Sequence, residues 1–219
     1  YSPDIATGWY DMIFIWAAIK MDQFLIEKAN ETWNISERIN EGREEFGHYR
    51  PQDRITHKIV PLAYPPHYFR STSPVAKNRA IFVGICPYGL ELFEKMEGIE
   101  LVWLGKNKLL SIDNLLENIS VGGFGVSLWK EKGNNYYGDP GKTKLYSACG
   151  LPVIMTNNTP YAKIIQETDA GIVIPYTKIA LHRAIKRILH HYDYYKSNVP
   201  KTWKYINADE VFRNIRLLE

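Results

Sequence analysis

The chain has 219 residues, of which 45% are hydrophobic and 13% aromatic, a composition typical of a folded globular protein and not of a disordered one. The formal net charge of +3 is too small to indicate a dedicated nucleic-acid binder, so we expect no nucleic-acid partner; it is compatible with a small anionic ligand. The two cysteines, Cys86 and Cys149, lack the spacing of a metal site and favour a reduced, cytoplasmic setting.

A long helix is expected over residues 9–29, "WYDMIFIWAAIKMDQFLIEKA". Its charged residues do not form one polar face, which leaves two interpretations: a helix buried against a partner, which we favour, or a helix at a membrane surface or between domains. The apolar run 12–19 is too short to cross a bilayer, which needs about 20 residues. Because partner helices would lie upstream of Tyr1, we expect an exposed apolar stripe that promotes membrane-surface contact or a homodimer.

The next elements lead to a domain boundary. "ETWNIS" (31–36) predicts a short strand, and Ser36 is a suitable cap for a helix that ends at Gly47. "HKIVPLAYPP" (57–66) predicts a strand that continues into a proline-rich linker. Between Arg70 and Asn78 the composition turns to Ser, Thr and Pro without apolar periodicity. We therefore expect two units, residues 1–70 and 71–219.

Beyond this boundary, short apolar strands alternate with helices. Strands are expected at 80–84, 99–105, 123–129, 152–156 and 170–175, and helices at 89–98, 112–120, 142–149, 160–168, 178–195 and near the C-terminus. Continuously apolar strands that alternate with helices predict a parallel sheet covered on both faces, which is a doubly wound, Rossmann-like α/β domain. Ligands bind such sheets at the carboxyl ends of the strands, here the turns after Gly84, Trp129 and Thr156.

Polar turns precede two of these helices, "DPGK" (139–142) and "NNTP" (157–160). Thr159 as a cap and Pro160 as the first helical residue are typical of a helix start, where free N–H groups bind anions such as phosphate. Lys142 would add a cation, and Lys144 is a second candidate. The alternative is ordinary capping with solvated lysines, which the turns alone favour. Asp139 stands alone, without an Asp-x-Asp pair or a His/Asp cluster, so no metal and no other cofactor is expected.

The stretch "GDPGKTKLYSACGLPVIMTNNTPYAKIIQETDAGIVIP" (138–175) resembles the donor-binding region of GT-B glycosyltransferases in the broad group around family 4. The preceding "GGFGVSLW" (122–129) is similar to a bacterial branch of these enzymes, and "AIFVG" (80–84) to the first strand of their nucleotide-sugar domain. The resemblance implies that residues 71–219 are the donor-binding C-terminal half of a GT-B fold. Residues 1–70 would then be a remnant of the acceptor domain with the interdomain linker.

The resemblance also implies an activity: transfer of a sugar from a nucleoside-diphosphate sugar to a glycan or lipid-linked acceptor hydroxyl, in bacterial glycan or polysaccharide synthesis. The expected location is cytoplasmic, or peripheral at the inner face of the membrane. Helix N-termini and a phosphate-contacting Lys142 would stabilise the leaving diphosphate without a metal. The catalytic base stays unassigned. The residues expected at the nucleotide-sugar site are Gly84, Trp129, Lys142, Tyr146, Asn158 and Thr159.

Two departures from the family pattern keep alternatives open. Leu145 stands where many members carry a glutamate that contacts the ribose, and residues 85–87 lack the basic residue that often follows the "VG" strand. An inactive nucleotide-sugar-binding module and a nucleotide-sugar epimerase of the same fold are the alternatives. A Rossmann dehydrogenase is disfavoured because no G-x-G-x-x-G motif follows "AIFVG". Since a whole enzyme of this fold needs two domains, we expect this chain alone not to turn over.

Overall fold

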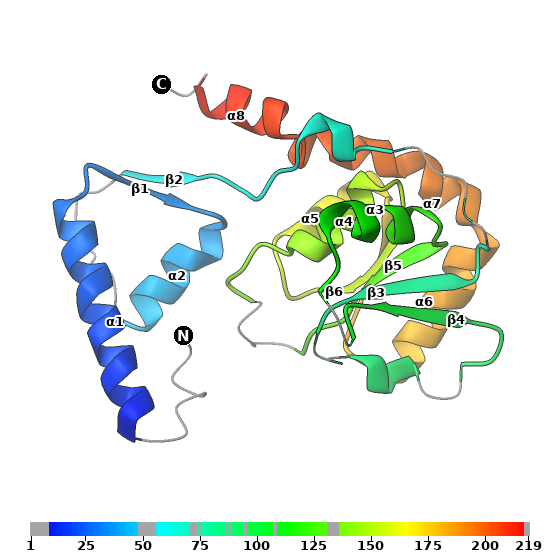
Figure 1. Cartoon of the computed structure of the whole chain (residues 1–219), viewed down its shortest axis with the longest axis horizontal. Coiled ribbons are helices and arrows are strands. Elements are labelled where there is room, and N and C mark those ends of the chain that lie inside the picture. The colour runs from blue at the N-terminus through cyan, green and yellow to red at the C-terminus, as the bar shows by residue number, and fades with distance from the viewer. Residues whose placement is uncertain are drawn as a thin grey trace.

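A computed structural model describes residues 9–47, 56–70, 74, 76–85, 87, 89–93, 96–106, 109–130 and 136–216. Its centre is a five-stranded, wholly parallel sheet with the strand order β4-β3-β5-β6-β7 (Figure 1). The strands are β3 (Arg79–Val83), β4 (Glu100–Leu104), β5 (Phe124–Ser127), β6 (Val153–Thr156) and β7 (Gly171–Ile174). The predicted Rossmann-like α/β architecture is therefore confirmed.

Helices cover both faces of this sheet, which explains why its strands are apolar at consecutive positions. On one face, Ile81, Val153 and Met155 belong to a core with side chains of three helices: α3 (Ile112–Ser120), α4 (Gly141–Ala148) and α5 (Tyr161–Thr168). On the other face, Phe124 and Ile154 belong to a core with α6 (Lys178–His190). Alternate residues of each strand thus serve opposite cores.

The central strands bring three turns to one edge of the sheet. β5 pairs with both β3 and β6 in parallel, so the segments that follow these three strands leave the same edge. At β5 the sheet approaches α4 closely: a Cβ atom on Gly125 would lie 2.3 Å from Cγ of Tyr146. Tyr146 is fully buried there, and its hydroxyl oxygen accepts a hydrogen bond of 2.7 Å from the Val83 N–H. This contact fixes the start of α4 beside the ends of the strands.

A smaller lobe precedes the sheet and is drawn to one side of it in Figure 1, in contact with the turns at Tyr137 and Asn158. It consists of α1 (Trp9–Lys28), β1 (Glu31–Asn34), α2 (Glu37–Glu45) and β2 (Thr56–Ile59), with β1 and β2 paired in parallel. A linker with a 3₁₀ turn, η2 (Pro66–Tyr68), leads to the large sheet. The C-terminal helix α8 (Ala208–Arg216) starts against this linker, since the Ala208 N–H donates to the Tyr64 carbonyl at 2.9 Å.

Three local expectations are wrong. The helix expected over 89–98 is only the 3₁₀ turn η3 (Leu90–Phe93) among the described residues, after Gly89 with a φ of +85° that no right-handed helix accepts. The long helix 178–195 is broken at His191 into α6 and α7 (Tyr192–Asn198). The 3₁₀ helix η4 (Val199–Tyr205) follows. Ser36 precedes α2 but does not cap it, because its hydroxyl donates to the Tyr137 carbonyl at 2.6 Å instead.

The first helix exposes apolar side chains, as the sequence predicts, but they are spread around the helix and do not form one stripe. Trp16, Met21, Phe24 and Leu25 are each more than half exposed. Of the side chains described on α1, only Ile26 is buried. None of the helices in the described ranges combines the length and apolarity that a membrane crossing requires.

Candidate donor-binding site

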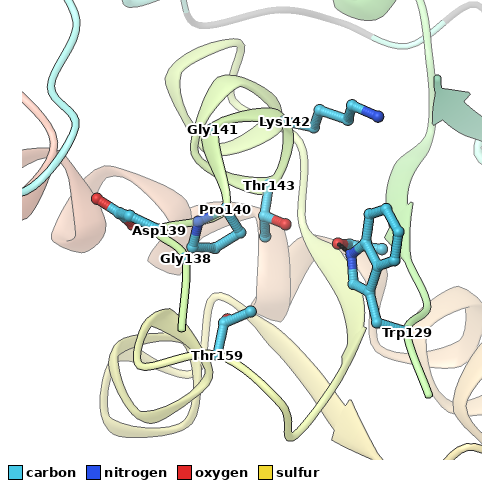
Figure 2. Close-up of a pocket in the computed structure, with 9 residues that line it drawn as sticks. Trp129, Gly138, Asp139, Pro140, Gly141, Lys142, Thr143 and Thr159 are labelled. Atoms are coloured by element: carbon cyan, nitrogen blue, oxygen red, sulfur yellow. Dashed lines mark hydrogen bonds between the residues drawn. The ribbon is translucent and has the colours of Figure 1, made fainter. Parts of the chain in front are cut away.

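A pocket opens at the carboxyl edge of the sheet, between the starts of α4 and α5 (Figure 2). Its volume of about 120 Å³ is below the roughly 300–1,000 Å³ of pockets for drug-sized ligands, so it fits one part of a larger ligand. Three of the six residues expected at the site, Trp129, Lys142 and Thr159, lie in its wall. The others in the wall are Ser127, Gly138, Asp139, Pro140, Gly141 and Thr143.

Two threonine hydroxyls in this pocket have no hydrogen-bond partner among the residues that the structure describes. Thr143 is fully buried and Thr159 is 2% exposed, yet among the described residues nothing bonds to either Oγ1. Figure 2 shows Thr143 on α4 and Thr159 before α5, on two sides of the same space. A buried polar group without a partner costs about 1–3 kcal/mol, and most such groups in folded proteins are satisfied. The pair therefore indicates a polar ligand between the two helices.

Both helix starts can add to the binding of an anion. α4 begins at Gly141 and α5 at Tyr161, and backbone N–H groups point out of the start of each helix. Some of them are already bonded: the Ala162 and Lys163 N–H groups of α5 donate to the two preceding carbonyls at 3.1 and 3.2 Å. Together with the helix dipole, the N–H groups at these helix starts favour negative charge at the pocket. Thr159 does not cap α5 with its side chain, contrary to expectation; its carbonyl accepts from the Ala162 N–H at 3.1 Å. Its hydroxyl is thereby left for a ligand.

Trp129 and Lys142 form one wall of the pocket. Two hydrogen bonds hold Trp129: its backbone N–H donates to Thr156 Oγ1 at 2.9 Å, and its indole Nε1–H donates to Ser127 Oγ at 3.1 Å. The exposed Lys142 side chain places Nζ 5.7 Å from the centroid of the indole ring. This cation–π contact aligns a positive charge with a flat aromatic surface at the pocket mouth.

Asp139 and Lys144 form a buried ion pair that faces the linker. Their side chains are 6% and 2% exposed, and Lys144 Nζ bonds to Asp139 Oδ2. Lys144 also donates to the Leu62 carbonyl at 2.8 Å, and the Leu62 N–H donates to Asp139 Oδ2 at 2.6 Å. Burial raises the pKa of the Asp139 carboxyl and lowers the pKa of the Lys144 ammonium, while the charge of each partner opposes these shifts.

This pair corrects one expectation. Lys144 is not available as a second cation for a phosphate, because it is engaged with Asp139 and with the Leu62 carbonyl. In Figure 2 the Asp139 carboxylate points away from Thr143 and Thr159, although Asp139 is one of the residues that line the pocket. Lys142 is consequently the lysine of α4 that remains a candidate for ligand contact.

The remaining expected residues lie near the pocket but outside its wall. Gly84 is buried after β3, and its carbonyl accepts from Trp103 Nε1 at 2.6 Å. Tyr146 is in the core, where it positions α4 rather than a ligand. Asn158 is 2% exposed; its Oδ1 accepts from the Thr156 hydroxyl at 3.0 Å, and its Nδ2 has no partner among the described residues.

Thr143 is the functional candidate that the sequence analysis missed. Its position in the sequence could have identified it, because Thr143 directly follows the "DPGK" turn and lies in the first turn of α4, next to the expected anion site. Leu145, which stands at the position of the ribose-binding glutamate, is 4% exposed and belongs to the core. Within the described ranges, no group of three or more His, Cys, Asp or Glu side chains could hold a metal ion.

Two solved structures resemble this arrangement, and both are GT-B glycosyltransferases. Sucrose-phosphate synthase from Thermosynechococcus elongatus superposes with a TM-score of 0.63 at 14% identity, over 92% of this chain and 60% of that one. WaaG, a glycosyltransferase involved in lipopolysaccharide biosynthesis, superposes with a TM-score of 0.53 at 14% identity, over 79% of this chain and 57% of that one. The fold is therefore of the GT-B class, and the chain spans about 60% of the length of these structures.

The sequence itself gives the family. Residues 99–215, just over half of the chain, match the family described as "Glucosyltransferase 3-like, C-terminal domain". The chain belongs to this family, and the matched residues include α4, α5 and the whole wall of the pocket. No curated protein sequence matches the chain.

Proposed function

We propose that this chain carries the donor half of a glycosyltransferase that moves a sugar from a nucleoside diphosphate to an acceptor hydroxyl. The observation that carries the proposal is a pair of buried hydroxyls, those of Thr143 and Thr159, that lie between two helix starts beside Lys142 and find no partner in the described part of the chain. Family membership supports the reaction class. Following the sequence-based expectation, the proposed acceptor is a glycan or a lipid-linked sugar at the cytoplasmic face of a membrane.

In the proposed reaction, the group that most needs electrostatic stabilisation is the leaving diphosphate. The acceptor oxygen bonds to the anomeric carbon, the bond from that carbon to the diphosphate oxygen breaks, and the hydroxyl proton passes to a base. The diphosphate departs with the bonding electrons, and its growing negative charge needs fixed donors. The N-termini of α4 and α5, the threonine hydroxyls and Lys142 would supply them. We assign no base, because no described residue is placed for that role.

Nucleotide binding tests this proposal directly. We expect the protein to bind at least one of UDP, GDP and ADP in a calorimetric titration, because the diphosphate is the part that the pocket residues suit. Binding should persist in EDTA, since helix dipoles and Lys142 take the place of a metal. Failure of all three nucleotides to bind at millimolar concentration, with the protein folded by circular dichroism, would contradict the proposal. Loss in EDTA and recovery with Mg²⁺ would contradict metal independence.

An inactive nucleotide-sugar-binding module is the second candidate, and Leu145 favours it. The buried Leu145 has no carboxylate to offer a ribose, so one contact of the family pattern is missing. Assayed together with the acceptor-binding half that an enzyme of this fold needs, an active enzyme should release nucleoside diphosphate from a nucleotide sugar when an acceptor is supplied. An inactive module should bind the nucleotide and release none.

We further propose that α1 mediates self-association. The exposed Trp16, Met21, Phe24 and Leu25 form an apolar surface of the kind that drives protein–protein or membrane contact. Light scattering at rising concentration should show a dimer that Phe24→Glu weakens at least severalfold, an effect expected from burying a charge in an apolar interface. Ile179→Glu is the matched control, because Ile179 is 67% exposed on α6. A monomer at all concentrations would contradict the expectation.

A further inference from the structure

Arg38 of the N-terminal lobe reaches both turns that frame the pocket. It is the second residue of α2, and its Nη1 donates to the carbonyl oxygen of Asn158 at 2.8 Å and to that of Tyr136 at 3.3 Å. Its guanidinium carbon lies 4.2 Å from the ring centroid of Tyr136. One side chain thus joins a residue next to Thr159 to a residue just before Gly138, two positions in the pocket wall.

Other contacts of the lobe hold only one of these turns. Ser36 Oγ donates to the Tyr137 carbonyl at 2.6 Å, and the Tyr137 hydroxyl donates to Glu45 Oε2 at 2.6 Å. At Gly42, α2 approaches the same ring so closely that a Cβ atom would lie 2.8 Å from Tyr137 Cδ1. These contacts fix the turn 136–141 to α2. Among the hydrogen bonds of the described lobe residues, those of Arg38 alone connect it to Asn158 as well.

The guanidinium group of Arg38 is suited to hold two backbone segments at a fixed separation. A guanidinium group is planar, always charged, and carries five donors at fixed angles, so two carbonyls bonded to it are held at a set separation. Hydrogen bonds to a charged donor are stronger than those between neutral groups. Asn158 immediately precedes Thr159, whose hydroxyl is unpartnered in the pocket, so a shift of the Asn158 carbonyl would move that hydroxyl relative to Thr143.

We propose that Arg38 is a positioning residue: from the N-terminal lobe it fastens the turns 136–141 and 156–160 to each other and sets the separation of Thr143 and Thr159 across the pocket. The proposal rests on the proposed function only for the identity of the ligand. It makes the affinity of the pocket depend on docking of the two lobes, because the α2 residue that holds the pocket together belongs to the other lobe.

Hydrogen exchange measured by mass spectrometry on the ligand-free protein tests the positioning itself. Arg38→Ala should speed exchange in peptides covering both 136–144 and 156–163, because each turn loses a bond that restrains it. Arg43→Ala is the matched control. It removes an arginine from the same helix, but one that bonds within the lobe, to Asp22 at 3.1 Å and to the side chain of Asn34. It should speed exchange where α2 meets α1 and leave the peptide 156–163 unchanged. The peptide 136–144 does not distinguish the two variants, because Ser36 and Glu45 also hold it to α2.

Nucleotide affinity provides a readout that a merely structural residue would not move. With whichever of UDP, GDP and ADP binds the wild type, Arg38→Ala should weaken binding by about three- to tenfold, since one charge-assisted contact acts through the backbone. Arg38→Lys should recover part of this loss, because lysine keeps the positive charge but its shorter side chain does not reach the position of Nη1, which donates to both carbonyls. Arg43→Ala should lower the melting temperature and leave the affinity unchanged.

The outcomes separate this proposal from the proposed function. Faster exchange in both turns, with no nucleotide bound even by the wild type, would support the positioning role and count against the proposed function. Unchanged exchange, faster exchange in 136–144 alone, or equal effects of Arg38→Ala and Arg43→Ala would overturn the proposal. So would looser turns with unaltered affinity in a protein that binds a nucleotide.

Discussion

Lys144→Met is expected to lower the free energy of unfolding by about 3–5 kcal/mol, because it leaves a buried charge without its partner. The Asp139 side chain is 6% exposed, and in the wild type Lys144 supplies the opposite charge. Methionine keeps an unbranched apolar side chain of similar length, with sulfur in place of one methylene, and lacks the ammonium group. Urea unfolding followed by circular dichroism measures the change. Lys163→Met is the control: Lys163 forms an exposed pair with Glu167 on α5, and its loss should cost no more than about 0.5 kcal/mol.

The same variant should show a pH dependence of known sign. Burial already raises the pKa of Asp139, and removal of Lys144 takes away the charge that lowers it. A carboxyl group whose pKa is higher in the folded than in the unfolded protein takes up a proton on folding, so the folded state gains stability as the pH falls through the folded pKa. The deficit of Lys144→Met should therefore shrink between pH 7 and pH 5. A deficit that is the same at both values would contradict an unpaired buried carboxylate.

The double variant Lys144→Met with Asp139→Leu separates the charge from the contact with the linker. Replacing both members of a buried ion pair by apolar side chains is often close to neutral, so most of the loss should be recovered. A loss of about 1–2 kcal/mol in the free energy of unfolding should remain, because the N–H and the carbonyl of Leu62 each lose a hydrogen-bond partner. Recovery to the full wild-type value would mean that the bonds to Leu62 contribute nothing.

The fold followed from the sequence because its signals are local. Continuously apolar segments such as β5 and β6 predict a buried parallel sheet, and a proline-containing turn before each helix predicts helix starts at its carboxyl edge. The roles of single side chains did not follow, because their partners are far away in the sequence. Lys144 bonds to Leu62, 82 positions earlier, and Arg38 bonds to Asn158, 120 positions later. Nothing in the local pattern distinguishes the buried Lys144 from the exposed Lys142.

The helix expected over 89–98 illustrates the same limit. Its apolar spacing suits a helix, but Gly89 packs so closely against Leu128 that a Cβ atom would lie 2.6 Å from the Leu128 Cβ, and its φ is positive. Two backbone segments that follow different strands pack closely here, and this tertiary contact prevents the helix. Helix propensity is a local property of the sequence and does not predict such a contact. Tyr146 was expected at the nucleotide-sugar site because it matches an aromatic residue of the family pattern. Its hydroxyl instead accepts a hydrogen bond from the Val83 N–H inside the sheet.

The role of Lys142 depends on where its charge lies. It is in the first turn of α4, where a cation opposes the helix dipole, and its ammonium lies 5.7 Å from the centroid of the Trp129 ring. A bound diphosphate would offset the repulsion between the Lys142 charge and the helix dipole, because it places negative charge between the lysine and the helix start. Stability and nucleotide affinity should therefore respond differently when this lysine is removed.

Lys142→Ala should weaken nucleoside-diphosphate binding by about 1.5–3 kcal/mol, as expected for the loss of one charge-assisted hydrogen bond. Its free energy of unfolding should stay within about 0.5 kcal/mol of the wild type, because relief at the helix start offsets the lost cation–π contact. Lys144 cannot serve as the control, since it is buried in an ion pair. Lys163→Ala can, because Lys163 lies in the first turn of α5 with its side chain 80% exposed, outside the pocket wall. Calorimetry on the wild type and the two variants tests this prediction. A loss of affinity confined to Lys142→Ala would assign Lys142 to the diphosphate. Equal, small losses of affinity in both variants would mean that Lys142 is a solvated surface lysine without a role in binding.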